Sequence, residues 1–232
     1  MSERQPPETC REIVFEAIAH VICEVDPERF DIGLRLKTPK GKFYGNLAAL
    51  AKAESFVFAI NAGMYHSDMS PVGLHVENGA EIAPLNLGDA DGNFFLKPNG
   101  VFYVDVNGVA GVRESMAFAA SRPELAMATQ SGPMLVIDGQ IHPRFEPDGA
   151  SRYVRNGVGV RADGVVVFAI SRSEVSLGSF ARLFRDELAC PNALFFDGAI
   201  SALHDGQRYV VGGGFPAGPM VAIRKRERPV DQ

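Results

Sequence analysis

The stretch RNGVGVRADGVVVFAIS, residues 155–171, consists of two apolar runs joined by the dipeptide Asp163-Gly164. Asp-Gly between two such runs is a strong signal for a tight β-hairpin, because both residues tolerate the backbone that the turn requires. The stretch therefore predicts two neighbouring antiparallel strands. Hairpins of this kind argue against a doubly wound parallel sheet, in which strands alternate with helices.

Further stretches show the same design. Turn dipeptides lie between apolar runs at Asn78-Gly79, Asn107-Gly108 and Asp138-Gly139. Residues 13–25 are rich in β-branched and aromatic side chains and predict another hairpin, and residues 30–36 alternate as a half-buried strand does. Strands are also expected within residues 55–65 and 192–198, each running directly into a polar, glycine-containing turn.

Helical periodicity is restricted to a few segments. Residues 46–54 carry apolar side chains at helical spacing behind a capping Asn46. Residues 176–190 give the clearest helix, with Ser176 or Ser179 as its cap. A short polar or helical piece is expected over residues 121–129. The glycine-rich residues 212–218 precede no long helix, so they make a poor dinucleotide fingerprint and are expected to form a mobile or ligand-covering loop.

These elements predict an α+β fold in a single domain, with mixed or antiparallel β-sheets and a few packed helices. No proline- or serine-rich linker and no internal repeat divides the 232 residues. The expected boundaries are an N-terminal tail over residues 1–12, the domain over residues 13–223, and a charged C-terminal tail over residues 224–232.

Composition excludes several classes of function. The net charge of −5 argues against a nucleic-acid partner, and the basic cluster at residues 224–228 is short enough to be a solvated tail. No apolar stretch approaches the length that membrane insertion requires. The first ten residues form no apolar signal region, so the chain as it stands is expected to be cytoplasmic, or exported if a leader was removed.

The three cysteines fit neither a zinc-binding spacing nor a CxxC redox pair. An odd number of thiols favours a reducing compartment, whereas Cys10 and Cys23 could pair in an exported chain. Cys190 follows a helical pattern and is expected to be a small buried apolar residue.

Four segments share one feature, an apolar run that stops abruptly at small and polar residues. They are Asn61-Ala62-Gly63, Gln130-Ser131-Gly132-Pro133, Arg155-Asn156-Gly157-Val158-Gly159, and Asp197-Gly198 with Ser201 beyond it. Glycine allows the backbone to approach a ligand closely, and arginine can bind a phosphate or carboxylate through two donors. Each segment alone is consistent with an ordinary turn. Together they predict one shared polar pocket.

The same segments carry a family resemblance. FAINAGMY, ATQSGPMLVIDG, RNGVGVRADG and NALFFDGAIS, in this order and spacing, resemble the phosphodiester glycosidase family over roughly residues 20–205. The bacterial branch is the most similar, because GNFFLKPNGVFYV and SFARLFRDEL resemble it as well. The animal enzyme of the family, which uncovers mannose 6-phosphate, has an Asp-Gly-Gly-Gly-Ser-like run where this chain reads Asp-Gly-Ala-Ile-Ser, so the resemblance carries over the general pocket and not the animal enzyme's substrate.

The resemblance implies hydrolysis of a sugar-1-phosphodiester at the anomeric carbon, with a carbohydrate or glycan phosphodiester as substrate. The positions that match the family's motifs are Asn61, Gly63, Ser131, Gly132, Arg155, Gly159, Asp197 and Gly198. From the polar segments themselves we add Gln130, Asn156 and Ser201 as expected substrate-binding residues. Oligomeric state is left open.

The chemistry of a phosphodiester relaxes the usual requirement for two carboxylates. The leaving group is a phosphate monoester whose remaining proton has a pKa of about 6, so it departs with little help from a general acid. Stabilisation of the negative charge on its oxygens matters more. We hypothesise that Arg155, with donors near Ser131 and Gly132, holds the phosphate. Asp197 would act as base toward water or stabilise positive charge at the anomeric carbon, and Asn61 would orient the sugar or the water.

Other polar residues are candidates for the same site. Glu174 and Asp148 are candidates for a second carboxylate, although each suits a solvated turn or helix start. His66 with Asp68 could face the pocket. His142 and His204 lie in turns near the family segments, and His75 is expected to be a packed or edge residue. QSGP is not a nucleophile elbow, so a nucleophilic Ser131 is disfavoured.

No cofactor is expected. The histidines and acids lack transition-metal spacing, while a hard cation such as Ca²⁺ or Mg²⁺ on Asp197 and carbonyl oxygens is left open. The alternative function, from a different class, is a non-catalytic module that binds phosphorylated or acidic glycans through the same pocket.

Overall fold

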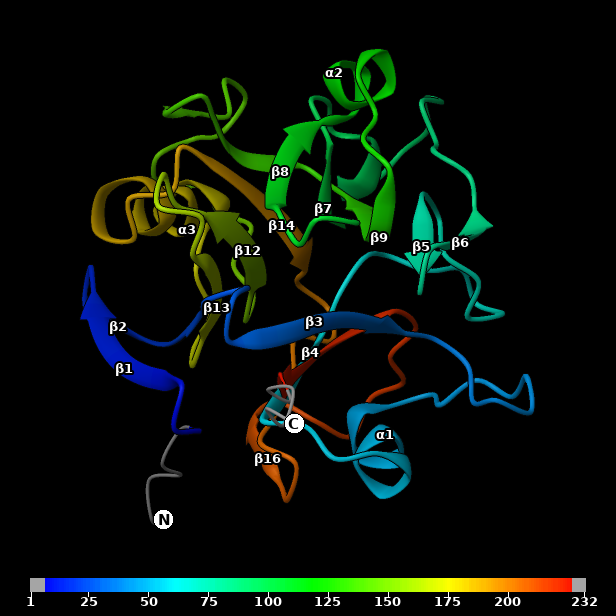
Figure 1. Ribbon diagram of the computed structural model, residues 1–232. Helices are drawn as coiled ribbons and strands as arrows, with labels where there is room; N and C mark the ends of the chain where they lie inside the picture. The colour runs from blue at the N-terminus through cyan, green and yellow to red at the C-terminus, as the bar shows by residue number, and fades with distance from the viewer. Residues whose placement is uncertain (1–6, 227–232) are drawn as a thin grey trace.

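The computed structural model describes residues 7–226, which fold into three antiparallel β-sheets with short helices at their margins (Figure 1). This arrangement confirms the α+β class and the antiparallel sheets expected from the turn dipeptides. The hairpin at residues 155–171 forms as predicted, with Asn156 opposite Ile170 and Val160 opposite Val166.

The largest sheet has seven strands. Their order is β1 (Cys10–Phe15), β2 (Ile18–Val25), β13 (Val166–Ser171), β12 (Asn156–Val160), β14 (Asn192–Asp197), β10 (Met134–Ile137) and β11 (Gln140–Ile141). The central hairpin thus lies between the N-terminal hairpin and β14, which ends at Asp197. The sheet brings together strands from the beginning, middle and end of the chain.

Two five-stranded sheets complete the domain. One has the order β16 (Tyr209–Val211), β15 (Leu203–His204), β4 (Phe58–Asn61), β17 (Met220–Lys225) and β3 (Phe30–Arg35). The other has the order β6 (Ala80–Ala83), β5 (His75–Glu77), β9 (Leu125–Ser131), β7 (Gly100–Asp105) and β8 (Ala110–Glu114). The predicted hairpins around Asn78-Gly79 and Asn107-Gly108 both belong to this last sheet.

The helices are short and begin at the expected caps. The Asn46 side chain accepts a hydrogen bond from Ala49 N at 2.8 Å and opens α1 (Leu47–Ala53). Ser176 accepts from Ser179 N at 3.1 Å and opens α3 (Leu177–Arg182), which continues as the π-helical turn η2 (Leu183–Glu187). The remaining pieces are α2 (Ser115–Ala120) and the 3₁₀ turn η1 (Asn93–Phe95).

The expectation of a polar or helical piece over residues 121–129 is wrong. The helix α2 lies before it, and residues 125–131 form β9, the central strand of its sheet. Its polar side chains Thr129, Gln130 and Ser131 are buried. Buried polar groups are tolerated where hydrogen-bond partners await them, and those partners come from distant segments that a local pattern does not reveal.

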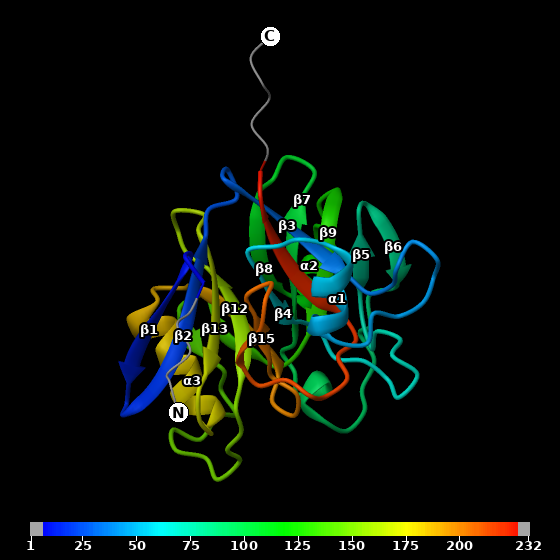
Figure 2. The same cartoon turned by 90° about the horizontal axis from the view of Figure 1, so that it is seen from below.

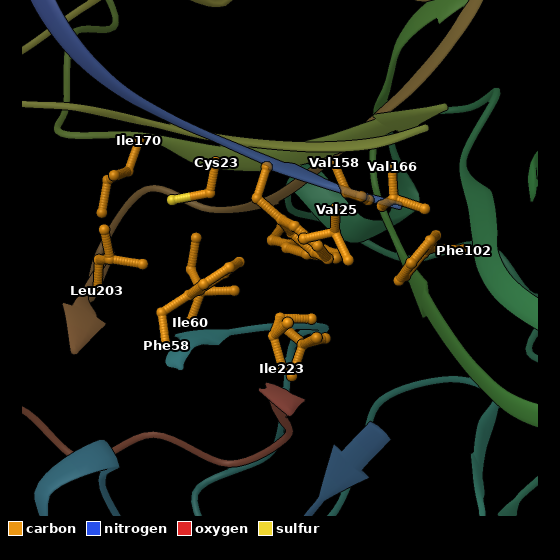
Figure 3. Packing of buried hydrophobic residues seen from close by; sticks show 14 of the residues in the cluster. Cys23, Val25, Phe58, Ile60, Phe102, Val158, Val166, Ile170, Leu203 and Ile223 are labelled. Carbon is orange, nitrogen blue, oxygen red and sulfur yellow. The ribbon is translucent and has the colours of Figure 1, made fainter. Parts of the chain in front are cut away.

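All three sheets contribute to one central core. Phe58 and Ile60 of β4, Ile223 of β17, Phe102 of β7 and Val158 of β12 converge there, as Figure 3 shows. Phe102 and Phe168 meet edge to face, with ring centroids 5.8 Å apart, a geometry that aromatic pairs prefer. The sheets therefore surround a shared interior, and their strand ends lie where loops can meet.

The seven-stranded sheet is apolar on its other face too. Successive side chains of β14 point to opposite faces, so Leu194 and Phe196 enter the central core while Phe195 packs toward Phe180 and Phe184 of the α3–η2 helix. Figure 2 shows α3 covering that outer face. Burial on both faces explains why NALFF is apolar without interruption.

The N-terminal hairpin carries a disulfide. Cys10 and Cys23 lie opposite each other on β1 and β2 with their Cα atoms 4.0 Å apart, and their sulfur atoms are bonded. The preference for reduced thiols drawn from the odd cysteine count is therefore corrected, since Cys190 alone remains free among the three. Cys190 is buried, as expected.

No helix within residues 7–226 is long and apolar enough to cross a membrane. At the C-terminus, β17 extends to Lys225, so the first basic residues of the expected tail are paired. Arg224 contacts Glu54 at 3.4 Å, and Arg226 contacts Asp31 at 3.0 Å. Residues 227–232 of that tail lie outside the described residues.

Candidate active site

A cavity of about 620 Å³ opens beside the end of β14. Loops that follow β4 and β14 form two of its walls, and the segment before β12 and the turn η1 form the others. Its lining residues are Met64, Tyr65, His66, Ser67, Asn93, Ser151, Tyr153, Asp197, Gly198, Ala199 and Ile200. Of the four predicted segments, one therefore lines the cavity itself, through Asp197 and Gly198, and the chain within two residues of two others, at Met64 and Tyr153, lines it beside them.

Asp197 is the acid of this cavity. Its Oδ1 accepts hydrogen bonds from Ala199 N at 2.5 Å and Ile200 N at 3.2 Å, so the loop after β14 holds the carboxyl in a fixed direction. Burial raises the pKa of the Asp197 carboxyl above its ordinary value, although the backbone donors act in the opposite direction. A half-buried carboxyl with a raised pKa in a cavity is a candidate for proton transfer.

Arg155 lies directly beneath the next residue, Gly198. A Cβ atom on Gly198 would stand 3.2 Å from Arg155 Nη1. The guanidinium is fully buried, donating from Nε to Val175 O at 2.8 Å and from Nη2 to Ser151 O at 2.9 Å. Its Nη1 is buried without a hydrogen-bond partner. Burial lowers the Arg155 pKa to about 10, so the group stays cationic at neutral pH.

Rings flank this cation on two sides. The Arg155 guanidinium carbon lies 5.4 Å from the centre of the Tyr153 ring and 5.3 Å from that of Phe195. Cation–π attraction offsets part of the loss of hydration. A buried arginine with one free donor beside an acidic cavity resembles an incomplete anion site.

Asn61 and Asn156 join two sheets behind the cavity. Asn156 Nδ2 donates to the backbone oxygen of Asn61 at 2.7 Å and to its Oδ1 at 3.0 Å, and Ala202 N donates to the same Oδ1 at 2.8 Å. Asn156 Oδ1 in turn accepts from Asp197 N at 3.2 Å. Ser201 Oγ donates to Asp197 O at 2.9 Å. These three side chains are buried outside the cavity lining and position the segment that carries Asp197.

The segment at residues 130–133 also lies outside the cavity lining. Ser131 Oγ donates to Phe196 O at 3.0 Å and so supports β14 from its neighbour sheet. Gly63 and Gly132 are points of close approach, where a Cβ atom would lie 2.5 Å from Gln130 O and 2.6 Å from Phe94 O, respectively. Gly159 is a third, since a Cβ there would lie 2.7 Å from Cys190 Sγ.

Gln130 bonds at both ends of its side-chain amide. Its Oε1 accepts from Leu74 N at 3.0 Å and Asn86 N at 2.9 Å, and its Nε2 donates to Asn86 O at 2.7 Å and Ser115 Oγ at 3.0 Å. The amide therefore ties β9 to two loops and to the start of α2. This geometry favours a structural role over the substrate contact expected from sequence.

Gln130→Met is accordingly expected to lower the free energy of unfolding by about 2–6 kcal/mol, because it leaves the buried N–H of Leu74 and the part-buried N–H of Asn86 unpaired, at about 1–3 kcal/mol each. Urea unfolding followed by circular dichroism measures the change. The matched control is Gln207→Met at an exposed turn, which should stay within about 0.5 kcal/mol of the wild type. A Gln130→Met protein of unchanged stability would return Gln130 to the candidates for substrate contact.

Several cavity residues escaped sequence reasoning. Tyr65 directly follows the Asn-Ala-Gly segment, and Tyr153 lies two residues before Arg155, so neighbourhood to a motif was the available signal. Asn93 comes from the turn η1, within the stretch GNFFLKPNGVFYV that resembles the bacterial branch of the family, which was its only signal. Tyr65 is close to the acid, since burial raises its pKa and the charge of Asp197 raises it further.

The other acids and histidines are distributed as follows. Of the second-carboxylate candidates, Glu174 is exposed and Asp148 pairs with Arg182 at 3.5 Å, and neither lines the cavity. His66 lines the cavity, whereas Asp68 does not. The remaining histidines considered from sequence, His75, His142 and His204, are all buried, which agrees with a packed role for His75.

A metal site lacks an obvious ligand set. Within residues 7–226, histidine, cysteine, aspartate and glutamate side chains form no group of three or more that could hold an ion. Asp197 alone supplies a carboxylate to the cavity lining. We therefore derive no step through a metal.

Comparison with known proteins identifies the family. The sequence profile of the phosphodiester glycosidase family matches residues 54–216, which include all four polar segments. The uncharacterised protein YigE of Escherichia coli K12 is 38% identical over 196 residues, covering 83% of this chain and 74% of its own. The molecule is thus an antiparallel α+β domain in which an acid lines one cavity and a buried arginine lies beside that cavity. The chain belongs to the phosphodiester glycosidase family.

Solved structures share the fold. The catalytic domain of zebrafish N-acetylglucosamine-1-phosphodiester alpha-N-acetylglucosaminidase, auto-inhibited by its pro-peptide, aligns with a TM-score of 0.67 over 97% of this chain and 86% of its own, at 14% identity. A hypothetical protein from Synechocystis aligns with a TM-score of 0.61 over 94% of this chain and 61% of its own, at 13% identity. At these identities the likeness concerns the fold.

Proposed function

We propose that this protein is a hydrolase that cleaves a sugar-1-phosphodiester at the anomeric carbon, releasing the sugar and a phosphate monoester. The observation that supports the proposal is that Asp197 lines a cavity and that Arg155 is buried behind the lining residue Gly198. Asp197 is the sole carboxylate among the lining residues, and the unpartnered Nη1 of Arg155 lies under the adjacent Gly198. One acid and one cation match a reaction whose leaving group needs charge stabilisation more than a proton.

Asp197 acts on water or on the sugar. As a base it removes a proton from the water that attacks the anomeric carbon, and the raised pKa brings its basicity closer to neutral pH. In its ionised form it also stabilises the positive charge that develops on the sugar ring. The loop donors at Ala199 and Ile200 hold the carboxyl in place for either role.

Arg155 supplies the positive potential for the leaving phosphate. Its charge lies in an apolar surrounding of Tyr153 and Phe195, where electrostatic attraction is stronger than in water. Its position beneath Gly198 replaces the earlier hypothesis that donors near Ser131 and Gly132 help to hold the phosphate. Those two residues and Asn61 support the walls and do not line the cavity.

The direct test is hydrolysis of sugar-1-phosphodiesters. Methyl or nitrophenyl phosphodiesters of α-glucose, α-mannose, α-galactose and α-N-acetylglucosamine are incubated with the full chain, and free reducing sugar is measured. Release of sugar from at least one supports the proposal. Saturable binding of these compounds without release would instead favour the non-catalytic glycan-binding module. Neither binding nor release across the panel would refute both.

The disulfide bears on the compartment. Disulfides persist in oxidising compartments and are rare in the cytosol, so Cys10–Cys23 leads us to propose that the protein works in an oxidising one rather than in the cytoplasm. Unreduced, denatured protein is expected to take up one equivalent of an alkylating reagent, at Cys190, and three after reduction. Three equivalents without reduction, in protein purified from its native host, would restore the cytoplasmic assignment.

A further inference from the structure

Tyr153 is an exposed aromatic ring at the wall of the cavity. Half of the residue, 50%, is open to solvent, although a tyrosine ring gains free energy by leaving water. It lines the same cavity as Asp197. A ligand that covers this exposed ring would remove its apolar surface from water. The proposed substrate contains a sugar ring whose apolar C–H face can do so.

The ring of Tyr153 is held in place from behind. Its backbone forms an isolated β-bridge with Val175, in which Tyr153 N donates to Val175 O at 3.3 Å and Val175 N donates to Tyr153 O at 2.8 Å. The guanidinium of Arg155 lies 5.4 Å from the ring centre. With backbone and ring both constrained, little side-chain entropy remains to be lost when a ligand binds.

The ring is also next to the reacting position. Gly198 follows Asp197 directly, and a Cβ atom on Gly198 would lie 3.5 Å from Tyr153 Cβ. Tyr153 thus packs beside the residue that follows Asp197, and both line the cavity in which the sugar would bind. Tyr65, the other tyrosine of the cavity, is used differently, since its hydroxyl donates to Pro216 O at 2.7 Å and its ring packs against Gly218.

We propose that Tyr153 is the platform on which the sugar ring of the substrate stacks, and that it thereby selects pyranosides with an apolar ring face. This inference deepens the proposed function and rests on it for the identity of the substrate. Dispersion and burial of apolar area supply the attraction, so the ring matters and the hydroxyl does not. Tyr153 is a binding residue, not a catalytic one.

The first experiment is a kinetic comparison of Tyr153→Phe and Tyr153→Leu with the wild type, using the phosphodiester that is hydrolysed best. Leucine keeps an apolar cover over Arg155 but removes the flat ring. It is expected to raise KM about 2- to 13-fold with kcat nearly unchanged, whereas phenylalanine keeps the wild-type KM. A Leu variant with wild-type KM, or with a loss confined to kcat, would overturn the platform.

The chain offers a matched control at Phe43. This residue also forms an isolated β-bridge, with Lys37, and also carries a cation over its ring, with Lys37 Nζ 4.5 Å from the centre. It lies outside the cavity lining. Phe43→Leu is therefore expected to leave KM unchanged, and an equal rise in both variants would show a general loss of structure and refute the inference.

The second experiment does not depend on turnover. Saturation-transfer NMR is recorded with methyl α-glycosides of glucose, mannose, galactose and N-acetylglucosamine. At least one is expected to receive saturation from the wild type and from Tyr153→Phe, and to lose most of it with Tyr153→Leu. No transfer to any of the four from the wild type, or equal transfer from the Leu variant, would overturn the platform. Ring-dependent binding by a protein that hydrolyses nothing would retain the platform and reject the proposed hydrolysis.

Discussion

Asp197→Asn is expected to lower kcat by about 10²- to 10⁴-fold while the protein stays folded, because removing a positioned base costs about that factor. Asparagine keeps an Oδ1 that can accept from Ala199 N and Ile200 N, so the loop after β14 retains its shape. The charge and the basicity are lost. Steady-state hydrolysis of a sugar-1-phosphodiester and a circular dichroism spectrum measure the two parts of this result.

The same carboxyl sets the pH dependence. As a base, Asp197 must be ionised, so kcat/KM should rise with pH through the pKa of this group, which burial places above that of an ordinary aspartate. The acidic limb of the profile should therefore lie above the usual aspartate range, and Asp197→Asn should abolish that limb in the residual activity. An unchanged acidic limb in the variant would assign it to another group.

Asp197→Asn is expected to stabilise the protein at neutral pH although it lowers kcat. Because the folded pKa of Asp197 is raised, the folded protein holds this proton more tightly than the unfolded chain does. The stabilisation of the folded state by this proton is therefore fully present below the pKa of Asp197 in the unfolded chain, and it is lost as pH rises through the pKa in the folded protein. Asp197→Asn removes that loss, so its melting temperature should exceed the wild-type value at pH 7 and converge with it in acid.

The control for Asp197 is Asp105, whose carboxyl also accepts hydrogen bonds from two backbone N–H groups of the turn that follows it. Asp105 Oδ1 accepts from Asn107 N and Val109 N, each at 2.8 Å, at an exposed turn outside the cavity. Asp105→Asn should retain wild-type kcat. If Asp197→Asn also retained it, Asp197 would be no more than a turn residue, and the proposed mechanism would fall.

Local patterns were sufficient to predict most of the strands, because each depends on neighbouring residues. Asp138-Gly139 adopts the left-handed backbone that its composition favours, and Asn78-Gly79 does the same. Gln130 shows that local patterns do not reveal hydrogen-bond partners from distant parts of the chain. Its place in a polar segment indicated substrate contact, whereas its amide makes four hydrogen bonds, with residues 44 to 56 positions earlier and with Ser115.

Part of the candidate site could likewise be predicted from the sequence, and part could not. Asp197 could be predicted, since a carboxyl that ends a buried strand has few structural reasons to be there. The sequence could not show which polar residues line the cavity and which support it. Asn61 and Asn156 are residue types that often bind ligands, but here they are hydrogen-bonded to each other across two sheets. Tyr153 was not predicted because the local sequence does not show that its side chain stays half exposed at the cavity, and its β-bridge to Val175 forms only in the fold.

Arg155→Met is expected to reduce kcat about 10²- to 10³-fold, the usual consequence of removing one group that stabilises transition-state charge. It should also abolish competitive inhibition by inorganic phosphate, which measures the anion site without turnover. Stability should change little. Within residues 7–226 no carboxylate pairs with the buried charge, and Val175 O keeps a donor in Tyr153 N after Arg155 is replaced. Its melting temperature should stay within about 5 °C of the wild type, about 1–2 kcal/mol for a chain of this size.

Gly198→Ala tests the same cation without removing it. The added Cβ would lie 3.2 Å from Arg155 Nη1 and 3.2 Å from Phe195 Cζ, so it crowds the free donor, while the backbone of Gly198 is not in the left-handed region and accepts alanine. We expect weaker inhibition by phosphate and a lower kcat/KM in a folded protein. Ala199→Gly, one residue further along the same wall, is the control and should keep phosphate inhibition. If Arg155→Met and Gly198→Ala both bound phosphate as the wild type does, the leaving group would be stabilised elsewhere in the cavity and the role assigned to Arg155 would be wrong.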